Sequence, residues 1–148
     1  MQQYFAKNKN LELEDSDYHH IRNVMRMKKG DVIKIVYDGF CYDCKLNMIV
    51  PNISFDIISK QKLDNNYSVD VAFSLIKEQK LDYLLQKSTE VGVGKLIPIH
   101  TKRSIIKIDR KKEQSKIERW NKIVKEASEQ SFRGSMPIVT NILSLKEL

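Results

Sequence analysis

The second half of the chain carries apolar positions in the order strand, helix, strand. Residues 69–76 are apolar on both faces of a strand, which predicts a strand that is covered on both sides. The next apolar positions recur with helical spacing, at Leu81, Leu84, Leu85, Ser88 and Val91. Gly92 and Gly94 are expected to end this helix, and residues 96–99 to form a second strand. The pattern therefore predicts a βαβ unit with a right-handed crossover.

A second, longer helix is predicted from about residue 112 to residue 132. Its apolar stripe consists of Ile117, Trp120, Ile123, Val124, Ala127 and Ser131. Gly134 and Pro137 end the helical pattern, and residues 136–140 are a candidate strand. Ser144 is then expected to cap a last turn. Residues 69–148 therefore predict an α/β domain, incomplete at its end because the last turn has nothing to pack against.

The first part of the chain predicts one small helix. Asp15 or Ser16 is its expected N-cap. Its apolar side consists of His20, Ile21, Val24 and Met25.

Short strands follow this helix. Residues 31–37 and 40–48 are two strands joined by the hairpin signal Asp38-Gly39, and residues 53–59 are a third. Such a pattern is typical of a compact β-barrel or roll. The polar residues 62–66 are the predicted linker, so the chain is expected to be a two-domain α+β protein with domains 1–68 and 69–148.

The length of 148 residues, 41% of them hydrophobic, is enough for one domain or two small ones. The chain has no apolar run of about eighteen residues, so we expect no transmembrane helix and no membrane partner. Its start lacks the features of a signal or transit peptide, and its two cysteines provide no disulfide framework. A cytoplasmic protein is expected.

The formal net charge of +7 comes from one window, residues 101–125, in which basic residues exceed acidic ones by seven. A basic segment of this kind points to a polyanion, most often nucleic acid. The alternative is a solvated, charged helix face. Charge alone does not separate the two interpretations.

The cysteines and histidines give no sign of a metal site. Cys41 and Cys44 have the C-x-x-C spacing, but on a strand residues three apart point to opposite faces. His19 and His20 are adjacent on the predicted helix, so their rings diverge. Two ordinary cysteines, two unrelated histidines and no bound metal are therefore expected.

Polar side chains gather at the ends of the two predicted helices of the α/β half. They are Gln86, Lys87, Thr89 and Glu90 in the first helix, and Glu126, Glu129, Gln130 and Arg133 in the second. They form either a functional site or solvated helix ends, and composition leaves both open.

Three separated blocks of sequence occur in a familiar order. They are HHIRNVMRMKKGD (residues 19–31), QKSTEVGVGKLIP (residues 86–98) with Lys102-Arg103-Ser104, and ERWNKIVKEASEQSFRGSMP (residues 118–137). Together they closely resemble the RsmE-type small-subunit (16S) ribosomal RNA uracil-N3 methyltransferases of the SPOUT superfamily. The resemblance extends over nearly the whole chain.

The resemblance implies a fold in two parts. It implies an N-terminal PUA-like β-barrel that helps to hold RNA, followed by the first part of a SPOUT α/β methyltransferase domain, Rossmann-like and knotted. Such a domain binds S-adenosylmethionine in the knot and works as a homodimer. The family's G-P-E-G and L-G-x-R-I-L-R-x-E-T-A motifs are absent, and both would lie beyond Leu148. The chain is therefore expected to be part of a longer protein, to lack its cofactor-binding residues and to be inactive alone.

The resemblance also implies roles for individual residues. Methyl transfer to uracil N3 requires that the proton on N3 is removed or that the developing anion is stabilised. The candidates near the catalytic cleft are Glu90, Arg103, Gln130 and Arg133. The candidate contacts to 16S rRNA of the small ribosomal subunit are Arg22, Arg26, Lys28, Lys29, Lys102, Arg103, Lys107 and Arg110. The alternative from another class is a non-catalytic RNA-binding module built from a PUA-like barrel and a basic helix.

Overall fold

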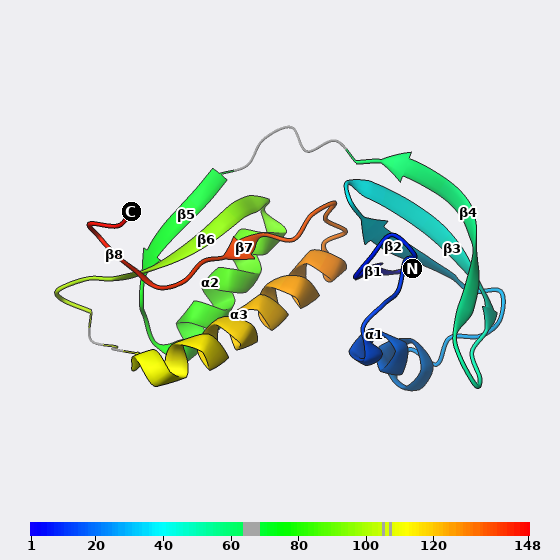
Figure 1. The fold of residues 1–148 in the computed structure, drawn as a ribbon, viewed down its shortest axis with the longest axis horizontal. Helices are drawn as coiled ribbons and strands as arrows, with labels where there is room; N and C mark the ends of the chain where they lie inside the picture. Colours follow the sequence, from blue (N-terminus) through cyan, green and yellow to red (C-terminus); the bar gives the residue numbers. More distant parts are fainter. Residues whose placement is uncertain (64–68, 105, 107) are drawn as a thin grey trace. The chain divides into compact units, whose positions relative to one another are not determined.

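A computed structural model of the chain describes residues 1–63, 69–104, 106 and 108–148, apart from the side chain of Arg110. The chain divides into two compact units, which we call unit 1 (Met1–Asn65) and unit 2 (Asn66–Leu148) (Figure 1). None of the helices formed by described residues is long and apolar enough to cross a bilayer. Unit 1 consists mainly of one β-sheet, and unit 2 alternates strands and helices, which confirms the predicted fold class.

Unit 1 contains one four-stranded sheet in the order β1-β2-β3-β4. Its strands are β1 (Gln2–Phe5), β2 (Val32–Tyr37), β3 (Phe40–Met48) and β4 (Ser54–Lys62). β1 runs parallel to β2, and the other pairs are antiparallel. Asp38 and Gly39 join β2 to β3 with φ values of 47° and 75°, which confirms the predicted hairpin turn.

The helical segment of unit 1 differs from its prediction. α1 (Asp15–His19) passes directly into a π-helical turn, η1 (His20–Val24). Glu14, not Asp15 or Ser16, is the N-cap, and its backbone N–H donates to the Asp17 carboxylate at 3.2 Å. Of the four residues predicted for the apolar side, only Ile21 is fully buried, while Val24 and Met25 are exposed. The predicted helical period fails because the π turn rotates these side chains out of register.

The sheet of unit 1 is buried on both faces near its centre and exposed at one edge. Ile33 and Ile35 of β2 pack in one cluster of buried side chains, and Val36 packs in another. β4 lies at the edge of the sheet, and nearly all of its residues are exposed. Lys62, predicted to start the linker, ends β4, and the rest of the predicted linker after Leu63 lies outside the described residues. The predicted domain boundary at residue 68 also lies there and stays a prediction.

Unit 2 is built on a parallel sheet in the order β5-β6-β7, with β8 also paired to β6. The elements in chain order are β5 (Val69–Ser74), α2 (Glu78–Glu90), β6 (Val93–His100), α3 (Arg110–Gln130), β7 (Ile138–Val139) and β8 (Leu143–Ser144). The predicted βαβ unit and the long helix are both confirmed. The expected last turn follows Ser144, whose carbonyl accepts the Glu147 N–H at 3.0 Å, but Ser144 also ends the short strand β8.

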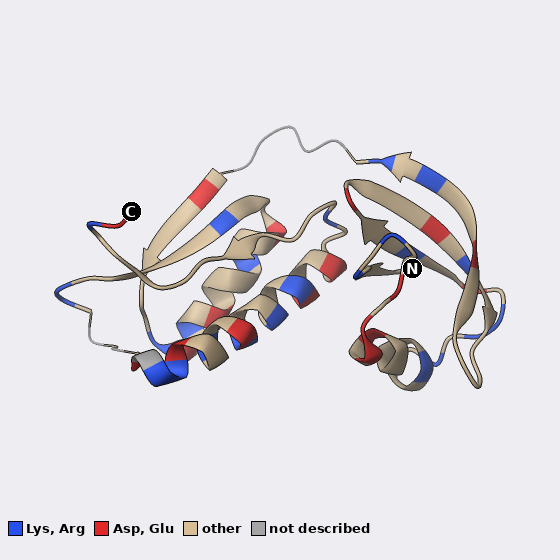
Figure 2. Ribbon diagram, in the orientation of Figure 1, with Lys and Arg blue, Asp and Glu red and all other residues tan. Residues whose placement is uncertain are grey.

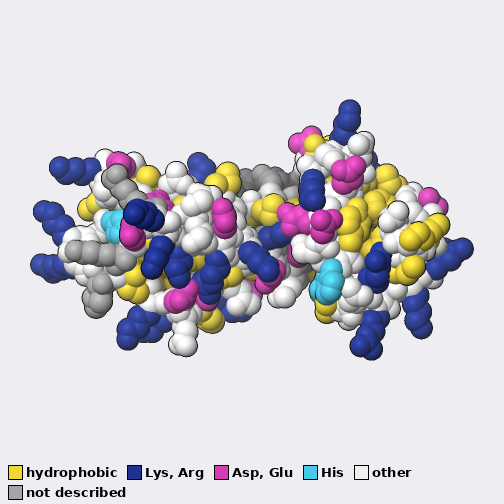
Figure 3. Space-filling view, turned by 60° about the horizontal axis from the view of Figure 1, so that its bottom comes forward, with side chains coloured by type: hydrophobic (Ala, Val, Ile, Leu, Met, Phe, Trp, Pro, Cys, Tyr) yellow, Lys and Arg dark blue, Asp and Glu magenta, His cyan; other side chains and the backbone are white. Residues whose placement is uncertain are grey.

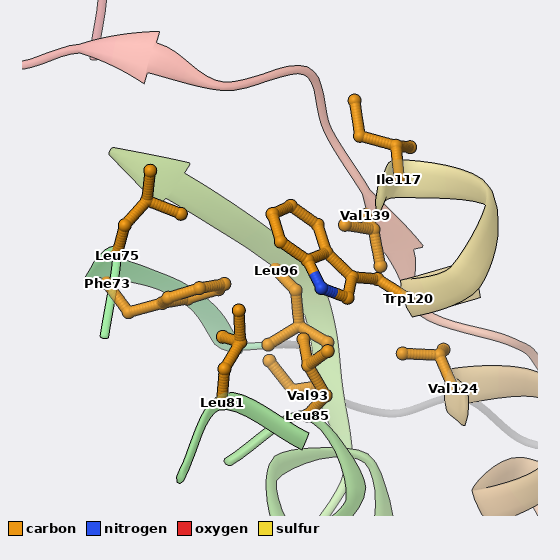
Figure 4. Close-up of a cluster of buried hydrophobic side chains, with 10 residues drawn as sticks. All are labelled: Phe73, Leu75, Leu81, Leu85, Val93, Leu96, Ile117, Trp120, Val124 and Val139. Atoms are coloured by element: carbon orange, nitrogen blue, oxygen red, sulfur yellow. The ribbon is translucent and has the colours of Figure 1, made fainter. Parts of the chain in front are cut away.

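The core of unit 2 lies between the sheet and its two helices (Figure 4). Trp120 of α3, only 1% exposed, points from its helix toward Leu96 of β6. The other buried members of the cluster are Phe73, Leu75, Leu81, Leu85, Val93, Ile117, Val124 and Val139. Large side chains from both helices and from three strands therefore share one cluster, which holds the layers together.

Three predictions for unit 2 are wrong in detail. β5 is not covered on both sides, since Val69 is 68% exposed. β5 is an edge strand, and both helices pack into one core and so leave part of this strand uncovered. Val91 is 85% exposed, and the buried position at the end of α2 is Thr89, whose hydroxyl donates to the Leu85 carbonyl at 2.7 Å. Gly92 ends α2 with a φ of 103°, as predicted, but Gly94 belongs to β6.

α3 ends in a Schellman motif. The N–H of Phe132 donates to the Glu129 carbonyl at 3.4 Å, and that of Arg133 to the Ser128 carbonyl at 3.0 Å. Phe132 therefore occupies the left-handed position, with a φ of 54°. Glycine is the usual residue there, since a Cβ atom makes this conformation unfavourable by about 1–2 kcal/mol.

Phe132→Gly is expected to raise the free energy of unfolding by about 0.5–1 kcal/mol. The substitution removes the Cβ clash, and little packing is lost because Phe132 is 51% exposed. Urea denaturation followed by circular dichroism measures the change. Phe132→Ala is the control, because it removes the ring but keeps the Cβ atom, and we expect it to leave stability nearly unchanged. Equal stabilisation by both variants would contradict the argument.

Candidate functional site

Polar groups converge at the carboxyl end of the unit 2 sheet, where open parallel sheets usually bind ligands. Ser74 is the last residue of β5, and Thr101 directly follows β6. Their hydroxyls lie close to that of Ser104, and the turn between Thr101 and Ser104 carries Lys102 and Arg103. Both basic side chains are exposed. This end of the sheet can therefore present two cations to an anionic ligand.

A different group of polar residues lies at the amino end of the same sheet. The guanidinium of Arg133 donates to the Thr89 carbonyl at 2.9 Å and so caps the last turn of α2. Burial lowers the pKa of Arg133 from its ordinary value. Glu90 accepts a salt bridge from Lys87 at 2.8 Å, and Gln130 is exposed at the end of α3. Arg133 therefore fixes how the two helix ends are joined.

The structure brings Glu90, Gln130 and Arg133 to one end of the sheet and Arg103 to the other. β6 separates the two ends, and its eight residues span about 26 Å at roughly 3.3 Å per residue. Within one chain, the four candidates for the catalytic cleft therefore do not form a single cluster. Their catalytic roles stay predictions.

Basic and acidic residues both occur along α3 (Figure 2), and some of its basic side chains pair with acidic side chains of α2. Lys116 forms a salt bridge with Glu78 at 2.8 Å, and Arg119 contacts Asp82 through both of its terminal nitrogens. The Asp82 hydrogen bond raises the pKa of Arg119. Within the described residues, Lys111, Lys112 and Lys122 form no salt bridge. On the face shown in Figure 3, basic and acidic side chains of unit 2 are intermixed.

The remaining RNA-contact candidates differ in how they are placed. Arg22 donates to the Pro51 carbonyl at 3.0 Å and so ties η1 to the loop before β4. Arg26, Lys28 and Lys29 are exposed in the segment that leads to β2. Arg110 begins α3, but its side chain is outside the described set, and Lys107 lies outside the described residues altogether. Unit 1 therefore presents three basic side chains from one short segment.

The two cysteines face opposite sides of β3, as predicted. Cys41 packs with Phe5 and Val36, whereas Cys44 packs in the cluster that contains Ile33 and Ile35. Burial raises the pKa of both thiols, that of Cys44 to about 12. Among the described residues, no three His, Cys, Asp or Glu side chains are grouped as metal ligands.

Both thiols are expected to resist alkylation by iodoacetamide at pH 8 in the folded protein. A raised pKa keeps each sulfur protonated, and burial excludes the reagent. Mass spectrometry after a timed reaction measures the modification, and the same reaction in urea is the control in which both cysteines should be modified. Rapid labelling of either cysteine in the folded protein would show an accessible thiolate.

An open hollow of about 160 Å³ lies beside the carboxyl end of β5. Its lining is mostly apolar and consists of Leu75, Ile76, Glu78, Leu81, Ile106, Ile108, Lys116 and Trp120. Pockets for ligands of the size of S-adenosylmethionine measure roughly 300–1,000 Å³. The two charged groups of the lining also pair with each other. The hollow therefore does not fit this cofactor, and a cofactor site beyond Leu148 stays a prediction.

Sequence reasoning missed the hydroxyl cluster of Ser74, Thr101 and Ser104. Its members are up to 30 positions apart and form no motif. The one available signal was the expected meeting of β5 and β6 in a parallel pair, which places the residues after both strands at one edge.

Comparison with known proteins gives two family matches. Residues 63–148 match a family described as "RNA methyltransferase domain", and residues 13–58 match one described as "RNA methyltransferase PUA domain". The chain is 36% identical over 160 aligned positions to the ribosomal RNA small subunit methyltransferase E of Bacillus subtilis. It is 34% identical over 125 positions to the ribosomal RNA small subunit methyltransferase E 2 of Borreliella burgdorferi.

The alignment covers all of this chain and 62% of the Bacillus protein, and 81% of this chain and 51% of the Borreliella protein. The chain thus spans less than two thirds of either relative. A crystal structure of ribosomal RNA small subunit methyltransferase E from Neisseria gonorrhoeae, bound to S-adenosyl methionine, is also similar. It shares 26% identity and a TM-score of 0.87, over 99% of this chain and 64% of that one. The chain therefore belongs to the family of RNA methyltransferases, with a PUA domain before its methyltransferase domain.

Proposed function

We propose that this chain contributes RNA docking and part of the catalytic domain to an enzyme that uses S-adenosylmethionine to methylate N3 of a uracil in 16S rRNA. The observation that carries the proposal is the pair of family matches over consecutive parts of the chain. The relatives' names specify ribosomal RNA of the small subunit, which supports 16S rRNA as the proposed substrate. The cofactor bound to the Neisseria relative supports the methyl donor.

The chemistry of this reaction sets the task of the chain's own residues. The N3 proton of uracil must leave, and the base must be unpaired so that its Watson–Crick edge is exposed. S-adenosylmethionine supplies the methyl group as a sulfonium. Arg103, exposed at the carboxyl end of the sheet, is the stronger candidate to stabilise the uracil anion or a nearby phosphate. Arg133 is the weaker candidate, since its guanidinium already binds the Thr89 carbonyl.

RNA docking involves both units in this proposal. Arg26, Lys28 and Lys29 contact the RNA backbone from unit 1. From unit 2, the contacts are Lys102 and Arg103 after β6 and Lys111 and Lys112 at the start of α3. The complete protein acts in the cytoplasm, on the small ribosomal subunit, as a homodimer. The 148-residue chain alone binds RNA but transfers no methyl group.

A methyl-transfer assay on the complete protein tests the function. Small ribosomal subunits that lack the modification are incubated with enzyme and S-adenosylmethionine, and the product is mapped by primer extension. A methyl group on N3 blocks base pairing, so we expect a new stop one nucleotide before one uridine of 16S rRNA. If methyl groups are incorporated without such a stop, the proposed N3 position is wrong. If no methyl group is incorporated, the proposed methyltransferase activity is wrong.

Titration of S-adenosylmethionine into the 148-residue chain by calorimetry tests where the cofactor binds. No detectable heat is expected if its site lies outside these residues. Clear one-to-one binding would show that the site is complete within them.

Reversing the charge of two lysines at the start of α3 is expected to flatten the salt dependence of RNA binding. Each phosphate contact contributes about 0.7 to the slope of log K against log salt for single strands, so Lys111→Glu/Lys112→Glu should reduce it by about 1.4. Glutamates in the first helical turn also favour the helix, so folding is retained.

Fluorescence anisotropy at several salt concentrations measures this slope. Lys80→Glu/Lys146→Glu is the matched control, because it changes the net charge equally at two other exposed sites of unit 2. An equal reduction in both variants would show that net charge, not contact by α3, determines the slope.

A further inference from the structure

The hydroxyl of Ser104 lies at the centre of the cluster at the carboxyl end of the unit 2 sheet. Its Oγ is 2.9 Å from the Ser74 Oγ and 2.8 Å from the Thr101 Oγ1. It also accepts the backbone N–H of Thr101 at 3.2 Å. Ser104 therefore has three partners, of which one belongs to β5 and two belong to the residue that follows β6.

These three contacts use the full hydrogen-bonding capacity of a serine hydroxyl, which has one proton to donate and two lone pairs. One lone pair accepts the Thr101 N–H. The other lone pair accepts one neighbouring hydroxyl, and the Ser104 proton goes to the remaining hydroxyl. Ser104 thus has no group left for a substrate, so its role is not that of a nucleophile or a phosphate ligand.

Two members of the cluster, Thr101 and Ser104, are the first and last residues of a β-turn. The Ser104 N–H donates to the Thr101 carbonyl at 3.1 Å, which places Lys102 and Arg103 at the two central positions of the turn. Both central side chains are exposed. The hydrogen bond between Ser74 and Ser104 ties this turn to the end of the neighbouring strand, so the backbone position of Lys102 and Arg103 is set by the sheet and not by the turn alone.

We propose that Ser104 is a positioning residue, which holds the turn so that Lys102 and Arg103 together contact a phosphate of the substrate RNA. The inference rests on the proposed RNA substrate. Two flexible cations lose conformational entropy when they bind one anion, and a preordered turn reduces that loss. The Ser74 hydroxyl assists by fixing Ser104 to β5.

Amide hydrogen exchange tests the local part of this inference without RNA. Ser104→Ala removes the acceptor of the Thr101 N–H and the link to Ser74, so exchange at Thr101 and Ser104 should become at least about 10-fold faster, while exchange in α2 stays unchanged. Ser104→Thr keeps the hydroxyl and should restore slow exchange. Unchanged exchange in Ser104→Ala would overturn the inference, whatever the RNA measurements give.

A double-mutant cycle tests the link to RNA. Ser104→Ala is expected to weaken binding of a uridine-containing single-stranded RNA by about 3- to 10-fold, and Ser104→Thr to restore it. In a Lys102→Ala/Arg103→Ala background, the same Ser104→Ala change should have no further effect. If Ser104→Ala lowers RNA affinity equally in both backgrounds, Ser104 does not position Lys102 and Arg103.

Two other outcomes separate this inference from the proposed function. If Lys102→Ala/Arg103→Ala weakens binding and Ser104→Ala does not, positioning is wrong and RNA contact by the turn stands. If neither change affects RNA affinity although the native chain binds, both the positioning role and the proposed contact at the turn are wrong.

Discussion

Trp120→Ala is expected to lower the free energy of unfolding of unit 2 by about 3–5 kcal/mol. The indole is 1% exposed and packs among side chains from both helices and the sheet. Its removal leaves a cavity that the surrounding strands cannot fill without separating from the helices. Because small domains are stable by only about 5–15 kcal/mol, this loss is a large share of the total.

The same variant should leave unit 1 unaffected, because the buried clusters of the two units share no residue. Hydrogen exchange read by mass spectrometry distinguishes the units: peptides from residues 66–148 should exchange faster, and those from residues 1–65 should not change. Trp120→Phe is the control, since it keeps an aromatic ring and should lower the free energy of unfolding by less. Equal acceleration in both units would show that they unfold together.

Arg133→Ala is expected to reduce methyl transfer by the complete enzyme by about 100-fold or more, with RNA affinity largely kept. The guanidinium joins the end of α3 to the Thr89 carbonyl at the end of α2. Without it, the loops after both helices lose their fixed positions, and a misplacement of about 1 Å can cost about 100-fold in rate.

Arg133→Lys is the matched variant, because lysine keeps the charge and can reach one carbonyl but lacks the planar donor pair. We expect intermediate activity from it. Single-turnover assays and RNA anisotropy are compared for the three proteins, with circular dichroism as the test of folding. An equal loss of RNA affinity and methyl transfer would make Arg133 a docking residue instead.

Local patterns in the sequence predict much of this fold. The helical period of Ile117, Trp120 and Val124 identified α3, and Asp38-Gly39 identified the hairpin between β2 and β3. In both cases neighbouring residues carry the signal, since a helix face and a two-residue turn are determined within a few positions.

Features that depend on distant partners were not predictable in this way. β1 was missed because its four residues are ordered by parallel pairing with β2, about 30 positions away. Arg119 lies in the basic window of residues 101–125, and its pairing with Asp82 was not predictable because Asp82 lies 37 positions earlier. Ser104 carried no visible role, because its contact with Ser74 forms only when β5 and β6 pair. For the candidate site, the sequence indicated the residue types, and tertiary contacts separated them into two groups.

The exposed edge of β4 has a consequence for the protein in concentrated solution. Ile57 and Ile58 are more than half exposed on a strand whose outer backbone groups can pair with another chain. Asp56, Lys60 and Lys62 interrupt this edge, and the Lys60 ammonium lies 4.0 Å above the Phe40 ring, where it covers an aromatic face as well. These charges act as gatekeepers against aggregation. Because salt screens them, unit 1 should self-associate more readily in the high-salt buffers commonly used to keep basic proteins free of nucleic acid.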